Sequence, residues 1–461
     1  MSGEATPAFD RRLDLRLILS IVATGVMSFL GVVVETAMNV AFPSLQEEFG
    51  ISVDRVQWVT TGYLLVLGLV VPASAFLKRR FRTRSLFVIA VAVFIAGSLL
   101  GAIAPSFLVL ILGRVLQALG TGIALPLMFN IILEQAPLHR LGTIMGFGAL
   151  ITAMAPAVGP SFGGLIIVNF GWREIFVVTI PVLVLALIAG AWAIRESGEA
   201  SRAQFDLVGW ALIAVAFTAL IFASNAAANS GWLSAAVLGL LALTIAGFAL
   251  FARHCLRSEN PLVDVRIFGN RTFVLAVGII VIVQFLTLGQ GYLIPNYAQI
   301  VLGADPFVAG LLLFPGCVLG ALLAPISGRI LDRFGARSPM LIGTIAIFVG
   351  MLLYAILFPR LGLVHIALIY CIHTIGQGFT SGTSMTTGLR GLSDRLRTDG
   401  NAVINTVQQL SGALGTGVTT SMIAASGEES AQQVFVLYAA LAAVAIVLWS
   451  GIFSRRNQQL T

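Results

Sequence analysis

Two ionisable residues lie inside long apolar stretches of the chain, where charge is otherwise rare. Glu35 follows Val32-Val33-Val34, and Arg114 lies in the run that begins at Phe107. A charged group in hydrocarbon is costly, and those that occur in membrane segments commonly serve transport or proton transfer. Loss of hydration favours the neutral form of a carboxyl group, so Glu35 could bind a proton and a lipophilic cation in turn. The alternative is a permanently protonated Glu35 held by a neighbouring hydroxyl or carbonyl.

Polar residues share the helix faces of these two groups. Asn39 lies four residues after Glu35, and Gln117 and Thr121 follow Arg114 at i+3 and i+7. An unpaired guanidinium must face a polar cavity or a partner, so Arg114 either lines such a cavity or ties helices together through Gln117 and backbone carbonyls. A direct Glu35–Arg114 pair is a further arrangement that the sequence leaves open.

Other polar and aromatic side chains in apolar stretches are candidates for a substrate cavity. His373 and Gln377 share a helix face, where they either line the cavity or hydrogen-bond between helices. Aromatic residues could form an adaptable binding wall, although each alone is more commonly a packing residue. With Asn39 and Gln117, the candidates are Phe129, Phe147, Gln284, Gln290, Tyr292, Phe314, His373 and Gln377.

The composition decides which class of protein must position these residues. Only 10% of the 461 residues are charged, 58% are hydrophobic, and the mean hydropathy is +0.98, whereas about 25% of a typical soluble domain is charged. These values exclude a soluble enzyme, a disordered chain and a nucleic-acid binder. No metal-ligand spacing, P-loop or nucleophile–base constellation occurs, and the three cysteines are scattered, so we expect neither metal nor organic cofactor. The sequence predicts an all-α polytopic membrane protein.

Apolar runs long enough to cross a bilayer predict fourteen transmembrane helices, near 16–42, 56–77, 85–104, 107–133, 141–167, 174–194, 207–225, 232–252, 272–300, 307–327, 338–358, 362–389, 400–425 and 432–453. All but four of the 27 Lys+Arg fall on the side of the termini; the exceptions are Arg55, Arg173 and Arg360 on the other side and Arg114 in a span. The positive-inside rule therefore places both termini in the cytoplasm. The polar start of the chain precedes a span too long for a signal peptide, and the net charge of +7 reflects cytoplasmic arginines. We expect the cluster Lys78–Arg84 to anchor this face near anionic lipid.

A repeat relates the two halves of the chain. Segment 75–84 recurs after 253 residues as 328–337, and the same offset places the glycine-rich segment 159–164 on 412–417. Parallel half-repeats are typical of secondary transporters. We predict an N-terminal six-helix bundle in residues 1–195, two inserted helices with an amphipathic linker in 196–271, and a C-terminal six-helix bundle in 272–461.

On these motifs the chain resembles the major facilitator superfamily, and within it the fourteen-helix drug:proton antiporters of the EmrB/QacA type. Segment 328–337 matches the superfamily loop signature except at Ile330, and segment 112–122 is similar to the span-4 signature around Arg114. Segment 155–164 is similar to the antiporter signature, and segment 35–43 to the first-span pattern. The residues that carry the conformational motifs are Gly159, Pro160, Gly163, Gly164, Gly328, Asp332, Arg333, Gly335 and Arg337.

Two departures from the family pattern concern charged residues. In the first loop signature the family's Asp falls on Arg79, so we expect no loop-locking ion pair from that Asp. In the first span the family's Asp aligns with Val34, and the acid follows one place later at Glu35, about 100° further around the helix.

The resemblance implies the major facilitator fold, a role of Arg114 in proton coupling, and a bend at Gly159–Gly164 that favours exchange over co-transport. The alternative for this segment is ordinary packing of small residues between helices. The resemblance also implies a proton-driven exporter of lipophilic, cationic or zwitterionic compounds in a bacterial cytoplasmic membrane. We expect a monomer that binds a small-molecule substrate and no nucleic acid. Whether it works with an accessory export partner stays open. The alternatives are an exporter dedicated to one endogenous metabolite, or a membrane sensor or enzyme on a transporter scaffold. Asp332, Arg333 and Arg337 could latch helix ends together, or serve only as topology charges.

Overall fold

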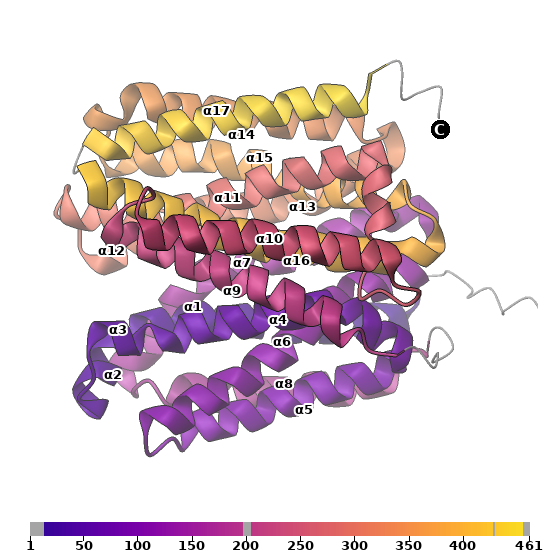
Figure 1. Cartoon of the computed structure of the whole chain (residues 1–461). Coiled ribbons are helices and arrows are strands. Elements are labelled where there is room, and N and C mark those ends of the chain that lie inside the picture. Colours follow the sequence, from indigo (N-terminus) through magenta and orange to yellow (C-terminus); the bar gives the residue numbers. More distant parts are fainter. Residues whose placement is uncertain (1–12, 197–203, 427–428, 455–461) are drawn as a thin grey trace, which may run out of the picture.

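The computed structural model describes residues 13–196, 204–426 and 429–454, and long helices dominate them (Figure 1). The long helices are α1 (Leu15–Val40), α4 (Trp58–Arg80), α5 (Thr83–Ala102), α6 (Phe107–Gln135), α7 (Leu141–Asn169), α8 (Glu174–Ala193), α9 (Leu207–Ser230), α10 (Ala235–Arg257), α11 (Arg271–Ile300), α13 (Phe314–Phe334), α14 (Arg337–Leu357), α15 (Leu363–Arg390), α16 (Asp394–Ser426) and α17 (Glu429–Ile452). The short ones are α2 (Phe42–Phe49), α3 (Val53–Val56), α12 (Pro306–Leu311), η1 (Leu138–Arg140), η2 (Val265–Gly269) and η3 (Phe358–Arg360).

Among the described residues, thirteen helices are long and apolar enough to cross a membrane. They confirm that the chain is a multi-pass membrane protein. Helix α16 is long but is not one of the thirteen. It packs against α4, α9 and α11, so its polar side chains have protein neighbours rather than lipid. Several arginines that the predicted orientation used lie outside the described residues: Arg11, Arg12, Arg202, Arg455 and Arg456.

The predicted spans and the helices differ most where the apolar run and the helix end at different places. The span predicted at 307–327 is interrupted after α12, and α13 continues beyond it to Phe334. Gly335 ends α13 in a left-handed conformation, with φ 81°. Hydropathy detects the apolar stretch only, whereas a helix continues until its backbone leaves the helical region. For the same reason α16 begins at Asp394, ahead of the predicted 400.

Helices α1 and α4–α8 pack together, and so do α11 and α13–α17; we call these groups the N-bundle and the C-bundle. In Figure 1 the N-bundle is indigo to purple and the C-bundle orange to yellow. The helices run roughly parallel to one another, so the molecule has two ends. End A is the end at which α1 begins and α17 ends, and end B is the end at which α1 ends and α17 begins.

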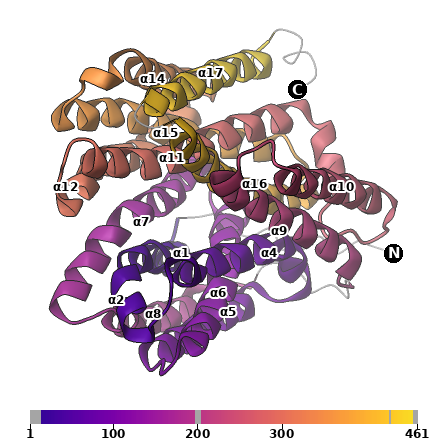
Figure 2. The same cartoon turned by 60° about the vertical axis from the view of Figure 1, so that its left-hand side comes forward.

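The inserted helices α9 and α10 form a hairpin that lies along both bundles. Helix α9 packs against α4 of the N-bundle and α16 of the C-bundle, and Figure 2 shows the hairpin beside these two helices. The Trp210 indole donates a hydrogen bond to the Leu69 carbonyl at 2.9 Å, and the Trp232 indole donates to Ser421 Oγ at 2.6 Å. The hairpin is therefore fastened to each bundle by one tryptophan.

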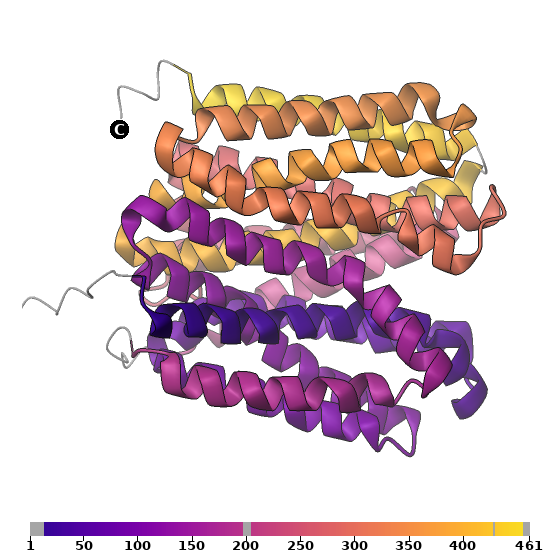
Figure 3. The same ribbon diagram turned by 180° about the vertical axis from the view of Figure 1, so that it is seen from behind.

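On the opposite side the bundles meet directly through α7 and α13, which lie side by side in Figure 3. Their contact is backbone against backbone near end A. A Cβ atom added at Gly146 would lie 2.5 Å from the Ala324 carbonyl oxygen, and one at Gly328 would collide with the Gly142 carbonyl. Small residues are needed wherever two helices approach this closely.

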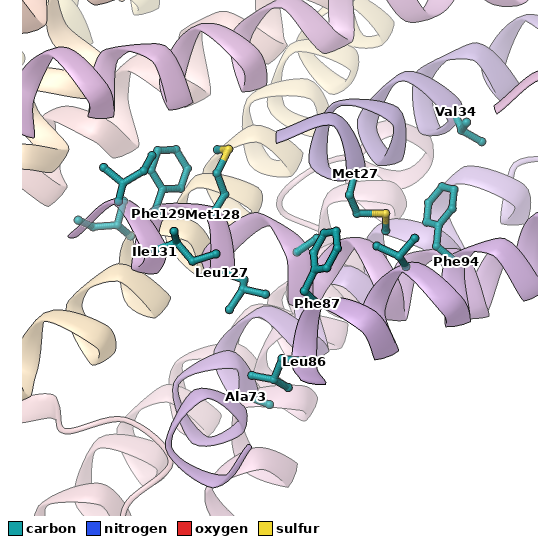
Figure 4. Close-up of a cluster of buried hydrophobic side chains, with 14 of the residues drawn as sticks. Met27, Val34, Ala73, Leu86, Phe87, Phe94, Leu127, Met128, Phe129 and Ile131 are labelled. Carbon is teal, nitrogen blue, oxygen red and sulfur yellow. The ribbon is translucent and has the colours of Figure 1, made fainter. Parts of the chain in front are cut away.

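The N-bundle core is built from apolar side chains of α1, α4, α5 and α6, part of which Figure 4 shows. Phe129 lies in it beside Met128 and is 4% exposed. At end B a polar tie closes this bundle. The Arg173 guanidinium holds both Glu48 carboxylate oxygens, at 2.6 and 2.9 Å, and the hydrogen bond from Arg173 holds the pKa of Glu48 below its ordinary value.

Candidate functional site

The polar residues predicted around Glu35 and Arg114 come together inside the N-bundle. Arg114, Gln117 and Thr121 lie on one face of α6, which points at α1, α4 and α5. Close approach of α5 and α6 positions this face, because a Cβ added at Gly97 would lie 2.5 Å from the Gly113 carbonyl oxygen. The two glycines thus allow a buried polar layer between two apolar helices.

Arg114 is 1% exposed and is held on three sides. Its Nε donates to the Val59 carbonyl at 3.1 Å, and Nη1 donates to Gln117 Oε1 at 2.9 Å. The guanidinium lies over the Tyr63 ring, 4.2 Å from its centroid. Gln117 Nε2 in turn donates to Ser98 Oγ at 2.9 Å. The remaining nitrogen, Nη2, is buried without a hydrogen-bond partner among the described residues.

Glu35 is half-buried on α1 and interacts electrostatically with Arg114. In the part of the chain that the structure describes, no hydrogen bond is made by the Glu35 carboxylate. A carboxylate and a guanidinium nitrogen that both lack a hydrogen bond therefore share one site. Because no hydrogen bond from the described residues occupies the Glu35 carboxylate, it can accept a proton or a cationic group.

Tyr63 fixes the geometry of this site. Its hydroxyl donates to Thr121 Oγ1 at 2.7 Å and lies 3.0 Å from the Gly31 carbonyl oxygen. The ring therefore joins α1, α4 and α6 directly beneath the Arg114 guanidinium. Sequence reasoning did not single out Tyr63 as part of the polar site, because one tyrosine in an apolar helix carries no signal of its neighbours.

The other predicted cavity residues lie on α1, α6, α7 and the C-bundle helices. Asn39 is exposed and accepts a hydrogen bond from Thr60 at 2.6 Å. Phe129 packs in the N-bundle core, whereas Phe147 and Phe314 are 45% and 39% exposed. No hydrogen bond among the described residues links the C-bundle candidates to Glu35 or Arg114. Those half-buried on the C-bundle are Gln284, Tyr292 and Gln377.

A second polar layer lies inside the C-bundle, between α11 and α15. His373 is 0% exposed, and its Nε2 lies 3.5 Å from Thr287 Oγ1. Gln290 is also fully buried and donates to the Leu286 carbonyl at 3.2 Å. His373 Nδ1 and Gln290 Oε1 have no partner among the described residues. These atoms are available to a hydroxyl or amide group brought between the helices.

The glycines of the predicted antiporter motif lie where α7 crosses α1. A Cβ added at Gly159 would collide with Thr36, and one at Gly163 would lie 2.8 Å from the Ala37 carbonyl oxygen. Gly164 faces open space and Pro160 is exposed. Helix α7 continues through this region from Leu141 to Asn169. Gly159 and Gly163 thus serve a close helix crossing beside Glu35.

The predicted end-A motif brings Asp332 to the beginning of α7. Its carboxylate accepts hydrogen bonds from the Gly142 and Thr143 amides, both at 2.8 Å, and from Thr143 Oγ1 at 2.9 Å. Arg390 of α15 donates to the same carboxylate at 3.1 Å. A carboxylate at a helix N-terminus is stabilised by the helix dipole. Arg333, Gly335 and Arg337 are exposed around this contact.

The other half of the repeat also forms a contact at this position, with a base in place of the acid. Arg79, which is related to Asp332 by the 253-residue offset, donates to Asp399 of α16 at 2.5 Å. Arg79 also donates to the carbonyls of Pro261 and Leu262, at 3.3 and 3.1 Å. The sequence excluded only an ion pair from an acid at position 79. In the structure the base at this position, in the last turn of α4, forms an ion pair. The predicted lipid-anchor cluster thus includes residues engaged in ion pairs, since Lys78 also lies 3.1 Å from Glu134.

The direct hydrogen bonds and ion pairs between the two bundles, as far as the structure describes the chain, lie in the half near end A. Besides the Asp332 and Arg79 contacts, Asn401 of α16 donates to Asn130 Oδ1 at 2.8 Å and to the Pro126 carbonyl at 2.9 Å. The structure is therefore a state that is closed at end A.

Replacing Gly328 by alanine is expected to open end A. The added methyl group collides with the Gly142 carbonyl, and overpacking of this kind costs about 1–3 kcal/mol, which converts to roughly a 5- to 150-fold change in population. Spin labels on cysteines introduced at the exposed Leu138 and Arg333 should report a longer distance in the variant. Gly164→Ala, where the methyl meets open space, is the control. An unchanged distance would show that the contact does not hold the state closed.

Comparison with known proteins identifies the class. The family described as Major Facilitator Superfamily matches residues 24–416, and the chain belongs to this superfamily, a family of membrane transporters. The human organic anion transporter MFSD10 shares its fold, with a TM-score of 0.69 at 12% identity over 94% of this chain and 99% of that one. The proton:xylose symporter XylE gives a TM-score of 0.64 at 14% identity, covering 94% of each chain.

Relatives are more similar in sequence. The chain is 38% identical over 410 residues to the lincomycin resistance protein LmrB of Listeria monocytogenes, which covers 88% of this chain and 87% of the relative. It is 31% identical over 421 residues to a multidrug resistance protein B homolog of Mycobacterium tuberculosis, covering 90% of this chain and 78% of the relative. The prediction of a transporter rather than an enzyme is thereby confirmed.

Proposed function

We propose that this chain is a proton-coupled drug efflux antiporter of the fourteen-helix type, with α16 as its fourteenth span. The observation that carries the proposal is the electrostatic interaction of Glu35 with Arg114, whose buried guanidinium has one nitrogen without a hydrogen-bond partner among the described residues. The names of the relatives, which concern resistance to lincomycin and to several drugs, support export of such compounds. Lincosamides, or other lipophilic compounds with a basic amine, are the proposed substrates.

In the proposed cycle, end A faces the cytoplasm, as the arginine distribution predicts, and both termini lie there. The structure then corresponds to the outward-facing half of the cycle. A proton taken up at Glu35 removes the counter-charge of a bound cationic compound, and the compound leaves. When the bundles rock to open end A, Glu35 loses the proton to the cytoplasm and binds the next cation. Exchange of one proton for one monovalent cation moves no net charge, so the pH gradient drives this export, at about 1.4 kcal/mol per pH unit.

The C-bundle layer at His373 and Gln290 is proposed to take the hydroxyl or amide groups of the same compound. Its unpartnered nitrogen and oxygen favour polar neutral groups, whereas the N-bundle site favours a charge. We further propose that the protein acts as a monomer in a bacterial cytoplasmic membrane, and that it needs no cofactor besides the proton gradient.

Transport into vesicles tests this function. Purified protein in liposomes that contain a pH-sensitive dye should move protons when lincomycin or a lipophilic amine is added on one side, and protein-free liposomes should not. A panel of unrelated amines then separates broad drug export from export of one compound. Compound movement without proton movement would contradict antiport, and proton movement with one compound alone would contradict broad drug export.

A further inference from the structure

A basic groove lies on the inserted hairpin, apart from the transport site. It is formed at end A by Leu212 of α9 and by Leu250, Arg253, His254 and Arg257 of α10, and its cavity volume is about 270 Å³. The floor is aliphatic, and the arginines stand four residues apart on one face of the last turn of α10. The groove thus combines an apolar surface with two fixed positive charges.

The charges of the groove are not neutralised from within the hairpin. Among the described residues, neither Arg253 nor Arg257 has an ion pair. Asp206, the acid that contacts His254 of the groove, is engaged: it lies 2.7 Å from His254 Nε2 and accepts the Gly209 and Leu262 amides at 2.8 and 3.0 Å. Its side chain is 6% exposed. The groove therefore presents positive charge to its surroundings and calls for an anionic ligand.

The surroundings of the groove decide what kind of anion reaches it. Helix α10 is one of the apolar membrane-length helices and exposes large aliphatic side chains along its length, Leu250 among them at 51%. Near end A this aliphatic face is followed by the two arginines. An acyl chain and its anionic headgroup would follow each other in the same order along α10. A soluble anion would use the charges and leave the aliphatic surface unused.

We propose that this groove binds an anionic phospholipid, with its phosphate between Arg253 and Arg257 and an acyl chain along the exposed face of α10. A guanidinium matches phosphate oxygens with paired hydrogen bonds. The site differs from the Lys78–Arg84 cluster, where Lys78 and Arg79 already contact Glu134 and Asp399.

Lipid retention by the full chain tests the site. The protein is purified in detergent, mixed with phosphatidylglycerol or phosphatidylcholine, and analysed by native mass spectrometry. Each basic residue near anionic lipid contributes about 1 kcal/mol, so Arg253→Gln/Arg257→Gln should weaken phosphatidylglycerol retention about 10- to 30-fold. Phosphatidylcholine retention should not change. Arg333→Gln/Arg337→Gln removes two exposed arginines at the same end and is the matched control.

Three outcomes would overturn the proposal. Equal loss in the control variant would show a general charge effect without a site. Unchanged retention in the groove variant would place the lipid elsewhere, and equal loss of both lipids would show that the arginines do not select an anionic headgroup. Competition with inorganic phosphate distinguishes a soluble-anion site, because millimolar phosphate should displace the lipid only if the acyl chain contributes nothing. Both variants alter exposed side chains, and a melting curve checks that they fold.

Discussion

Substrate-driven proton movement is expected to fall to the level of protein-free vesicles when Glu35 is replaced by glutamine. Glutamine keeps the size of the side chain but cannot exchange a proton, so the site is fixed in a form that resembles the protonated one. A cationic compound then loses its counter-charge, and its binding should weaken in the same variant. The measurement is dye-reported proton flux together with binding of a lipophilic amine.

The control for this prediction is Glu47→Gln. Glu47 is an exposed carboxylate on α2 at end B, outside the membrane-length helices, so its loss should leave proton flux and binding unchanged. A Glu35→Gln protein that still moves protons in response to the compound would show that the proton binds elsewhere. Loss of flux in both variants would instead point to a general effect of surface charge on the assay.

Reversing the charge of either Arg79 or Asp399 is expected to favour opening of end A, and exchanging both charges should restore part of the closed population. Arg79→Asp places two carboxylates together, and Asp399→Arg places two guanidinium groups together, where the ion pair now spans 2.5 Å. Removing one partner of a largely buried pair is strongly destabilising. Because Arg79 is partly exposed, we expect a shift of about 1–2 kcal/mol toward opening of end A, roughly 5- to 30-fold in population.

The double variant Arg79→Asp/Asp399→Arg should recover part of this shift. Recovery is incomplete because a carboxylate at position 79 cannot donate to the Pro261 and Leu262 carbonyls, and a guanidinium at position 399 cannot accept from the Asp264 amide. The readout is the distance between spin labels at Leu138 and Arg333, with transport measured in parallel. Additive effects of the two reversals would show that the residues do not act as a pair.

Most of the helices could be predicted from the sequence because each is a long apolar stretch; α16 is too polar to be one of these stretches, and hydropathy does not indicate the break between α12 and α13. The site could be predicted in part, since Glu35 and Arg114 are the charges that hydropathy leaves inside apolar runs. The face of Phe129 could not be predicted, because α6 is apolar on several sides and its neighbours are set by helix packing. The partner of Arg79 lies 320 residues away, and no local pattern indicates which loops meet.

The internal repeat contained information that could have indicated a contact at Arg79. The 253-residue offset already placed Arg79 on Asp332, one base over one acid. Because a base stands where the second half has an acid, the comparison of the two halves predicts that the first half lacks the contact made by Asp332. Asp332 accepts from backbone amides of α7, whereas Arg79 forms an ion pair with Asp399 of α16, so either an acid or a base at this position can join the two bundles.

The two tryptophans that fasten the hairpin set a limit on the movement of the bundles. Trp210 holds α9 to α4, and Trp232 holds the other end of the hairpin's first helix to α16. A rotation of one bundle against the other changes the distance between Leu69 and Ser421. Helix α9 must then tilt while both indole hydrogen bonds are kept, or one of these hydrogen bonds must break in every transport cycle.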